Sequence, residues 1–254
     1  MKLDEIYEMF DEDSRLNSTK SSQIEFIITT SFIDKYLTNE STVLDIGAGT
    51  GAYSLYYAAK EFRVMAIEPV LKNLDVLKSK ITPDMKLNAR LGNALDMAFI
   101  EDNSYDVVLC LGPLYHLDSI DKQLQCIKEV KRVCKPGGIM FFAYISNDMV
   151  VVTETFKYNP NFLTGSSYDH STFNVKNFPF VFLTVERAKE LMAKAGLKPL
   201  HHFAADGLSE LLSEKINKMD DDSFKQWVNY QKYVCEKEEM LGYSNHIVYV
   251  AKNK

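Results

Sequence analysis

Short apolar runs alternate with helical patterns through the first 145 residues of the chain. The run at 42–46 is β-branched and is followed by glycines, after which residues 53–60 show a helical period. Further strands are predicted at 63–67, 85–91, 105–111 and 139–145, with helices at 71–79 and ahead of Lys135. This alternation predicts an α/β fold with a parallel sheet and right-handed crossovers. In such sheets, ligands bind beyond the carboxyl ends of the strands.

The remaining segments are expected to decorate a single domain that spans residues 1–254. Residues 1–40 predict a helical cap, in which the polar stretch 11–22 separates two helical pieces between Ile6 and Leu37. Residues 41–146 form the predicted core, 147–184 a lid insertion, and 185–254 the C-terminal part of the core. The lid contains several aromatic residues, namely Tyr158, Phe162, Tyr168, Phe173, Phe178 and Phe180. The C-terminal part predicts a helix at 185–195, a strand at 198–204, two polar helices and a closing strand at 247–251.

The length and the net charge of the chain limit the classes of function that it can have. A chain of 254 residues with 46% hydrophobic residues can bury one substantial core. The formal charge of −6 provides no basic field for phosphates, so we expect no nucleic-acid partner. No apolar run approaches the length of a membrane span, and the first residues lack the pattern of a secretory signal. We therefore expect a cytoplasmic protein without a membrane partner, and the oligomeric state stays open.

The cysteines and histidines show no metal-binding pattern. Cys110, Cys126, Cys134 and Cys235 form no CxxC pair and have no histidine at zinc-ligand spacing. We expect all four to be reduced packing residues. His170 is isolated and the pair at 201–202 lacks ligand spacing, so no metal site is predicted.

The segment from Val43 to Gly51 carries the clearest chemical signal. Gly47, Gly49 and Gly51 alternate where a strand turns into a helix, which lets a ligand approach bare backbone. The glycine spacing of this segment also fits the fingerprint of dinucleotide-binding proteins. Asp45 favours a different ligand, because a carboxylate two residues before the first glycine repels a pyrophosphate but attracts an ammonium and a sulfonium. S-adenosylmethionine carries both cations and no phosphate. The alternative for Asp45 is a helix N-cap.

Polar or irregular residues also follow the next three strands. Glu68 ends the second strand, where its carboxylate can accept hydrogen bonds from both ribose hydroxyls. Asn93 and Ala94 follow the third strand and are placed to meet an adenine, unless Asn93 serves only as a turn residue. The fourth strand ends at Leu111, and the break at Gly112-Pro113 exposes backbone carbonyls beside the expected methionine ammonium.

Together these residues resemble the class I, Rossmann-like S-adenosylmethionine-dependent methyltransferases, and specifically a bacterial branch with Gly-Pro-Leu-Tyr-His-Leu after the fourth strand, here residues 112–117. The other matching segments are Asp13-Ser14-Arg15-Leu16, Glu25-Phe26, Gly92 to Asp96, Lys135-Pro136-Gly137-Gly138 and Ser244-Asn245-His246. The resemblance implies a three-layer fold whose sheet is mostly parallel with an antiparallel last strand.

The resemblance also implies S-adenosylmethionine as the cofactor and S-adenosylhomocysteine as the product. It places the methionine part at Asp45 to Gly51, the ribose at Glu68 and the adenine at the end of the third strand. Members of the family often have Asp where this chain has Asn93, whose amide oxygen can accept the same hydrogen bond. The expected cofactor contacts are Arg15, Asp45, Gly47, Ala48, Gly49, Gly51, Tyr53, Glu68, Pro69, Asn93, Ala94 and Leu111.

Methyl transfer is an in-line displacement on an activated carbon, so the protein mainly aligns a nucleophile and excludes water. If the acceptor is a hydroxyl or a protonated amine, His116 is the predicted base, unless it only makes a packing hydrogen bond at the start of a helix. Tyr115 is expected to contact the cofactor or the acceptor, or else to pack against the sheet. Arg15 is a candidate partner for the cofactor's carboxylate or for an acidic acceptor. His246 could reach the acceptor pocket, although turn chemistry explains Ser-Asn-His equally well.

The cap and the lid are expected to form the acceptor pocket, because loops over the strand ends usually carry specificity. Their aromatic residues suit an apolar or aromatic small molecule, or else they form a satellite core. Three other functions stay open: a methyltransferase that acts on RNA or protein, a catalytically silent S-adenosylmethionine-binding protein, and a nicotinamide oxidoreductase, which Asp45 disfavours.

Overall fold

The computed structural model describes residues 12–176 and 180–254. The first helical piece of the expected cap and Phe178 of the lid lie outside the described residues. Among the described residues, no helix is both long and apolar enough to cross a membrane.

The centre of the molecule is a sheet with the strand order β3-β2-β1-β4-β5-β8-β7. Its strands are β1 Thr42–Ile46, β2 Arg63–Glu68, β3 Leu87–Leu91, β4 Tyr105–Cys110, β5 Cys134–Ser146, β7 Pro199–Ala204 and β8 His246–Lys252. Strands β1 to β5 pair in parallel. Strand β8 runs antiparallel to both β5 and β7, which confirms the antiparallel last strand. Strand β8 therefore begins at the edge of the sheet where the parallel strands end.

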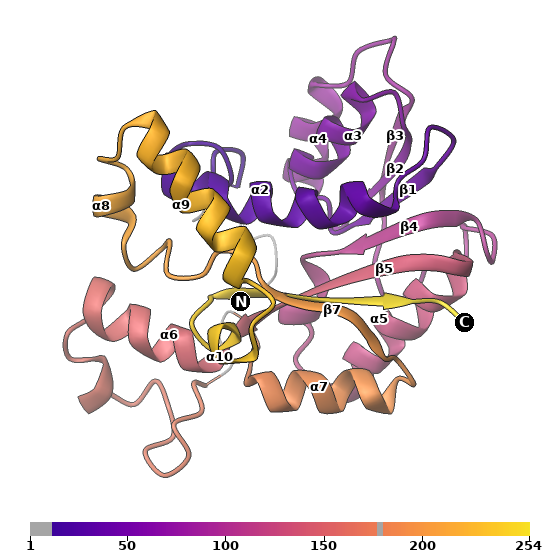
Figure 1. Cartoon of the computed structure of the whole chain (residues 1–254). Helices are drawn as coiled ribbons and strands as arrows, with labels where there is room; N and C mark the ends of the chain where they lie inside the picture. The colour runs from indigo at the N-terminus through magenta and orange to yellow at the C-terminus, as the bar shows by residue number, and fades with distance from the viewer. Residues whose placement is uncertain (1–11, 177–179) are drawn as a thin grey trace.

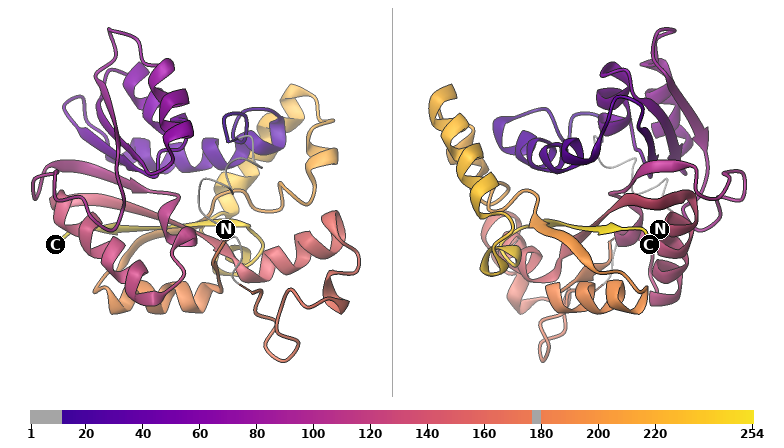
Figure 2. Two further views of the ribbon diagram at one scale, coloured as in Figure 1. Left: turned by 180° about the vertical axis from the view of Figure 1, so that it is seen from behind. Right: turned by 45° about the vertical axis from the view of Figure 1, so that its right-hand side comes forward.

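Helices cover both faces of the sheet, giving the expected three layers (Figures 1 and 2). One face carries α2 Lys20–Ile33, α3 Ala52–Ala59 and α4 Leu71–Ser79, and the other carries α5 Ile120–Val133 and α7 Val185–Lys194. Tyr57 of α3 and Ile28 of α2 are fully buried in the first core. Ile127 of α5 is fully buried in the second. The almost continuously apolar strand β4 lies between these two cores, as a central strand should.

Several element boundaries differ from the predicted ones. The third strand begins at Leu87 rather than at residue 85, because Met85 closes a turn by donating its N–H to the Thr82 carbonyl. The fifth strand begins at Cys134, which pairs with Tyr105 before the register shifts at the glycines. The pattern marked 135–138 as a break, whereas the structure accommodates it as an irregularity within the strand.

The cap helix α2 begins earlier than the polar pattern predicted. Thr19 is its N-cap, and Thr19 and Ser22 form a reciprocal capping box. The polar residues 19–22 therefore start the helix instead of separating two helices.

The lid region begins with helical segments and continues in turns and irregular structure. It contains α6 Asn147–Thr153, the π-helical turn η3 Glu154–Tyr158 and the short η4 Phe162–Thr164. It ends in a two-residue strand, β6 Phe182–Leu183, which pairs with the end of β5 and was not predicted. The C-terminal helices are α8 Ser213–Ile216, α9 Asp221–Val234 and α10 Glu238–Leu241. Helices α8 and α9 pack against α2 (Figure 1).

Candidate active site

The glycine turn folds back on the end of strand β2. Gly47, Gly49 and Gly51 all have positive φ, a conformation that glycine adopts without strain. The N–H groups of Gly47 and Ala48 both donate to the Ile67 carbonyl, at 2.8 and 3.0 Å. The Gly49 N–H donates to the Glu68 carboxylate at 2.8 Å. These three donors therefore point into the protein rather than outward to a ligand.

Two buried carboxyl groups lie beneath this turn, at the ends of neighbouring strands. Asp45 accepts a 2.6 Å hydrogen bond from the Ser54 hydroxyl of α3, and burial raises the pKa of Asp45 to about 6. Glu68 accepts the N–H groups of Gly49 and Val70, one on each oxygen. Burial raises the pKa of Glu68 to about 7, against the lowering effect of these two bonds. At neutral pH the pair makes the region under the turn electrically negative.

A short N-terminal segment crosses the outer side of the turn. The Glu12 side chain lies over Gly49, with its Cγ 3.3 Å from the point where a Cβ on that glycine would stand. Asp13 forms an ion pair with Lys80, which follows α4. Arg15 pairs with Glu12 at 3.2 Å and with Glu25 of α2 at 2.9 Å. Arg15 therefore lies near the glycine turn, as its predicted pairing with a cofactor carboxylate requires. In this structure its guanidinium group is paired with Glu12 and Glu25 instead.

The other residues predicted to contact the cofactor range from buried to exposed. Tyr53 is buried against Phe26 of α2, with ring centroids 5.0 Å apart. Asn93 is exposed, and its amide oxygen accepts the Leu95 N–H at 2.9 Å, so the turn role of Asn93 is present in the structure. Ala94 packs into the core of the second face. Pro69 is exposed and Leu111 is half-buried directly after β4. Contacts of these residues with a cofactor stay predictions.

The two predicted catalytic residues lie on the turn η2 Pro113–His116 but have different environments. A Cβ built on Gly112 would stand 3.3 Å from the Gly47 carbonyl and 3.7 Å from the Tyr115 hydroxyl. Tyr115 therefore reaches the junction between β1 and β4, and its ring also lines the large cavity described below. His116 is not among the residues that line this cavity. Burial lowers the pKa of His116 to about 4, so its imidazole is a weak base.

A cavity of about 860 Å³ adjoins Tyr115 at the carboxyl edge of the sheet. The cap contributes residues such as Ser22 and Glu25, and the lid contributes Thr153, Glu154 and Phe180. The segment around α8 and the start of β8 close the remaining sides. This agrees with the expectation that cap and lid surround a pocket. The segment around α8 is an addition that no sequence pattern predicted.

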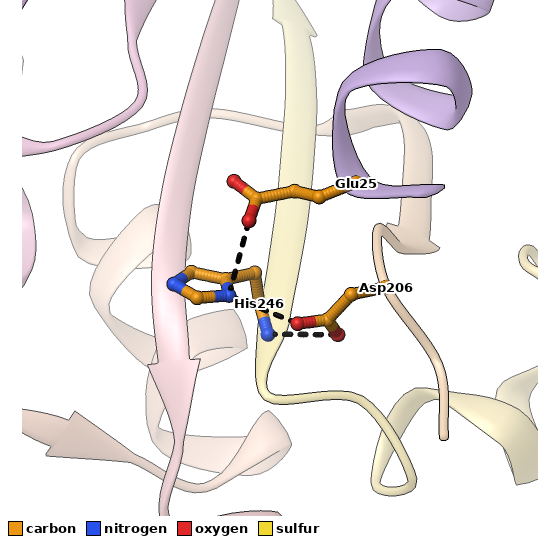
Figure 3. Close-up of side chains that lie close together, drawn as sticks. All are labelled: Glu25, Asp206 and His246. Atoms are coloured by element: carbon orange, nitrogen blue, oxygen red, sulfur yellow. Dashed lines mark hydrogen bonds and ion pairs between the residues drawn. The ribbon is translucent and has the colours of Figure 1, made fainter. Parts of the chain in front are cut away.

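Among the residues that line this cavity, three side chains from distant parts of the chain meet (Figure 3). The Nδ1 atom of His246 lies 3.0 Å from Asp206 Oδ2 and 3.4 Å from Glu25 Oε2. Asp206 also accepts the His246 backbone N–H at 3.1 Å and the Ser244 hydroxyl. Glu25 and His246 lie in motifs noted in the sequence, but no local pattern marks Asp206.

The three groups are close enough for one cation, since their atoms lie within 4.8 Å of one another. Arg15 already donates to the Glu25 oxygen that faces His246, and Asp206 faces the ring nitrogen. We therefore interpret the cluster as a network of hydrogen bonds and ion pairs, and the predicted lack of a metal site stays a prediction. The four cysteines are free and buried, as expected. The His201 ring forms a hydrogen bond with the Tyr36 hydroxyl, and the His202 ring forms one with the Tyr144 hydroxyl. We interpret both histidines as structural residues.

The sequence of the chain is similar to those of known methyltransferases. Residues 44–142, from β1 into β5, match the family model of a methyltransferase domain. A protein of Encephalitozoon cuniculi described as a candidate methyltransferase is 26% identical over 78% of this chain and 89% of its own length. A thiol S-methyltransferase of Rattus norvegicus is 33% identical, but the match covers only 42% of this chain and 44% of the rat protein.

The whole fold has counterparts among solved structures. A Thermotoga maritima S-adenosylmethionine-dependent methyltransferase, described as a candidate histamine N-methyltransferase, aligns with 98% of this chain and 99% of its own. Its TM-score is 0.59 at 18% identity, which establishes a shared fold. Because the relatives come from such different organisms, the bacterial branch stays a prediction. Residues 44–142 thus match a methyltransferase domain, and the chain as a whole shares the Rossmann-like fold of this solved methyltransferase.

Proposed function

We propose that the protein is an S-adenosylmethionine-dependent methyltransferase that acts on a small molecule. The observation that carries this proposal is the glycine turn, whose N–H donors at residues 47–49 are all used inside the protein. A pyrophosphate needs outward N–H groups at this position, so the turn does not suit a dinucleotide. Backbone carbonyls and the buried Asp45 and Glu68 suit a cationic ligand instead.

The residues present fit S-adenosylmethionine, which supplies a methyl group activated by its positively charged sulfur. Each oxygen of Glu68 accepts one backbone N–H and retains capacity for a ribose hydroxyl. The Gly47 carbonyl, next to Gly112 and below Tyr115, is available to the ammonium end. Arg15 is available for the carboxylate end, once it separates from Glu12, which lies over Gly49.

The cavity supports a small-molecule acceptor. Its volume of about 860 Å³ lies within the range of roughly 300–1,000 Å³ that is typical of small-molecule sites. The net charge of −6 gives no support for an RNA acceptor. A methyltransferase acting on RNA or protein, and a silent cofactor-binding protein, remain the alternatives that the experiment must separate.

The test is methyl transfer from methyl-labelled S-adenosylmethionine to a panel of small amines, thiols and phenols. Amines and thiols come first, because related proteins are described as histamine N- and thiol S-methyltransferases. We expect labelled small products with the wild type and with Glu40→Ala, an exposed control, and at least a tenfold loss in Glu68→Ala. Label found only on RNA or protein would contradict the small-molecule acceptor. Cofactor binding without any transfer would favour the silent binding protein.

A further inference from the structure

Strand direction places His246 beside the site of the proposed reaction. Because β8 is antiparallel to β5, its first residue, His246, pairs with Ile145 near the carboxyl end of β5. The imidazole lines the acceptor cavity, and its centroid lies 6.3 Å from that of the Tyr115 ring. Tyr115 in turn reaches the junction of β1 and β4. His246 is therefore the histidine that faces the cavity on the side of the glycine turn.

The ring of His246 has a fixed orientation. Asp206 holds both the backbone N–H and Nδ1 of His246, using one oxygen for each. Glu25 approaches the same ring nitrogen from α2. Nδ1 therefore faces the carboxylates of Asp206 and Glu25. Figure 3 shows that the second ring nitrogen, Nε2, points away from both carboxylates. This arrangement leaves Nε2 to exchange a proton with a bound molecule.

The charges around the ring make it a stronger base than an ordinary histidine. Burial lowers the pKa of His246, but Glu25 and Asp206 outweigh this effect and raise the pKa to about 9, while the nearby Arg15 opposes them. The Tyr115 ring completes the surroundings on the side of η2. His116, by contrast, has its pKa lowered to about 4 by burial and does not line the cavity.

We propose that His246, oriented by Asp206 and Glu25, accepts the proton of the acceptor atom that becomes methylated. This inference rests on the proposed methyltransferase function. The acceptor atom forms a bond to the methyl carbon, and the electron pair of the breaking carbon–sulfur bond stays on sulfur. The proton of the acceptor passes to Nε2 of His246. The substrate class is therefore a small molecule whose acceptor atom carries a proton. This atom belongs to a thiol, a hydroxyl, or an ammonium group that first gives its proton to His246 and then attacks as the neutral amine.

The first measurement is the titration of His246 by NMR in the full-length, histidine-labelled protein bound to S-adenosylhomocysteine. We expect a pKa well above that of an ordinary histidine, and a decrease of about one unit or more in Asp206→Asn. His170→Gln, in the exposed part of the lid, serves for assignment and as a control. An ordinary or lowered pKa for His246, or one that does not respond to Asp206→Asn, would overturn the proposal.

The second measurement is the pH profile of kcat/KM with an acceptor from the panel. Neutral imidazole is the active form, so activity should rise with pH, reach half its maximum near pH 9 and level off above it. His246→Gln should lose about 100-fold and show no such rise, which matches the usual contribution of a general base. Asp206→Asn should move the rise to lower pH. An unchanged profile in His246→Gln, or activity that a chelator abolishes and magnesium restores, would overturn the assignment.

Binding separates this proposal from the function on which it rests. S-adenosylmethionine affinity, measured by calorimetry, should be the same in His246→Gln and in the wild type. If the wild type does not bind the cofactor, the methyltransferase function fails; if binding is intact and the pH profile is unchanged, only the role of His246 fails.

Discussion

At the scale of single residues, the two carboxyl groups under the glycine turn oppose folding at neutral pH. Burial raises the pKa of Asp45 to about 6 and that of Glu68 to about 7, so folding makes both groups harder to ionise than they are in the unfolded chain. A cationic ligand would stabilise the ionised forms and offset this penalty. The site is therefore less stable empty than it would be with uncharged residues, which is common where function requires a buried charge.

Asp45→Asn should test this penalty. The folded-state pKa of Asp45 is raised, so its contribution to stability is present below about pH 3.8 and is lost as pH rises through about 6. Relative to the wild type, the variant should therefore gain on the order of 2 kcal/mol in free energy of unfolding between pH 4 and pH 8. Urea unfolding without ligand measures this, with the exposed Asp75→Asn as control. A difference that does not change with pH would contradict the burial of an ionisable group here.

Glu12 gives a second prediction at this scale. It covers Gly49 and holds Arg15, so a cofactor carboxylate must displace it. Glu12→Gln should therefore bind S-adenosylmethionine several-fold more tightly, while Glu40→Gln, which is exposed, should leave the dissociation constant unchanged. Weaker binding in Glu12→Gln would show instead that this carboxylate attracts the positively charged ligand.

The sequence pattern placed the glycines, Asp45 and Glu68 at strand ends, and the structure has them there. Their contacts with a cofactor stay predictions. The cluster at His246 was not predictable in this way, because Glu25, Asp206 and His246 come from α2, the segment after β7, and β8. Their meeting depends on strand order, and His116 was the more visible candidate because it lies within the motif at residues 112–117.

At the scale of elements, the turn between β1 and α3 depends on close packing against α4. A Cβ on Gly51 would stand 2.2 Å from Leu77 Cδ1, and φ is +94°. Gly51→Ala should therefore destabilise the protein by roughly 2 kcal/mol or more, from left-handed strain and from overlap with the buried leucine.

Gly242→Ala is the matched control for Gly51→Ala. Its φ is −64°, and no atom lies within 4 Å of the added Cβ. We expect this change to be neutral or slightly stabilising, because alanine restricts the unfolded chain. Thermal unfolding of both variants makes the comparison, and equal melting temperatures would contradict the packing at Gly51.

The elements that the sequence predicted poorly are those with weak local signals. Strand β6 has only two residues and exists because it pairs with the end of β5. The start of β5 was assigned too late, because Lys-Pro-Gly-Gly resembles a turn and yet lies within a paired strand. Tertiary pairing overrides propensity at both places.

At the scale of the whole molecule, the sheet brings all the proposed chemistry to one edge. The carboxyl ends of β1, β2 and β4 carry the glycine turn, Glu68 and Tyr115, and the start of β8 adds His246. The cap, the lid and the α8 segment then enclose a cavity beside these residues. The alternating pattern was sufficient to predict this edge, because parallel strands joined by helices all end on the same side. The antiparallel direction of β8 followed only from the resemblance.

The central claim is that this edge binds S-adenosylmethionine. Calorimetric titration of the purified full-length protein with S-adenosylmethionine, S-adenosylhomocysteine and NAD tests it most directly. We predict binding of the first two, loss of both in Glu68→Ala, retention in the exposed control Glu40→Ala, and no binding of NAD. Tight binding of NAD without binding of S-adenosylmethionine would contradict the proposed function and would show that the glycine turn binds a dinucleotide.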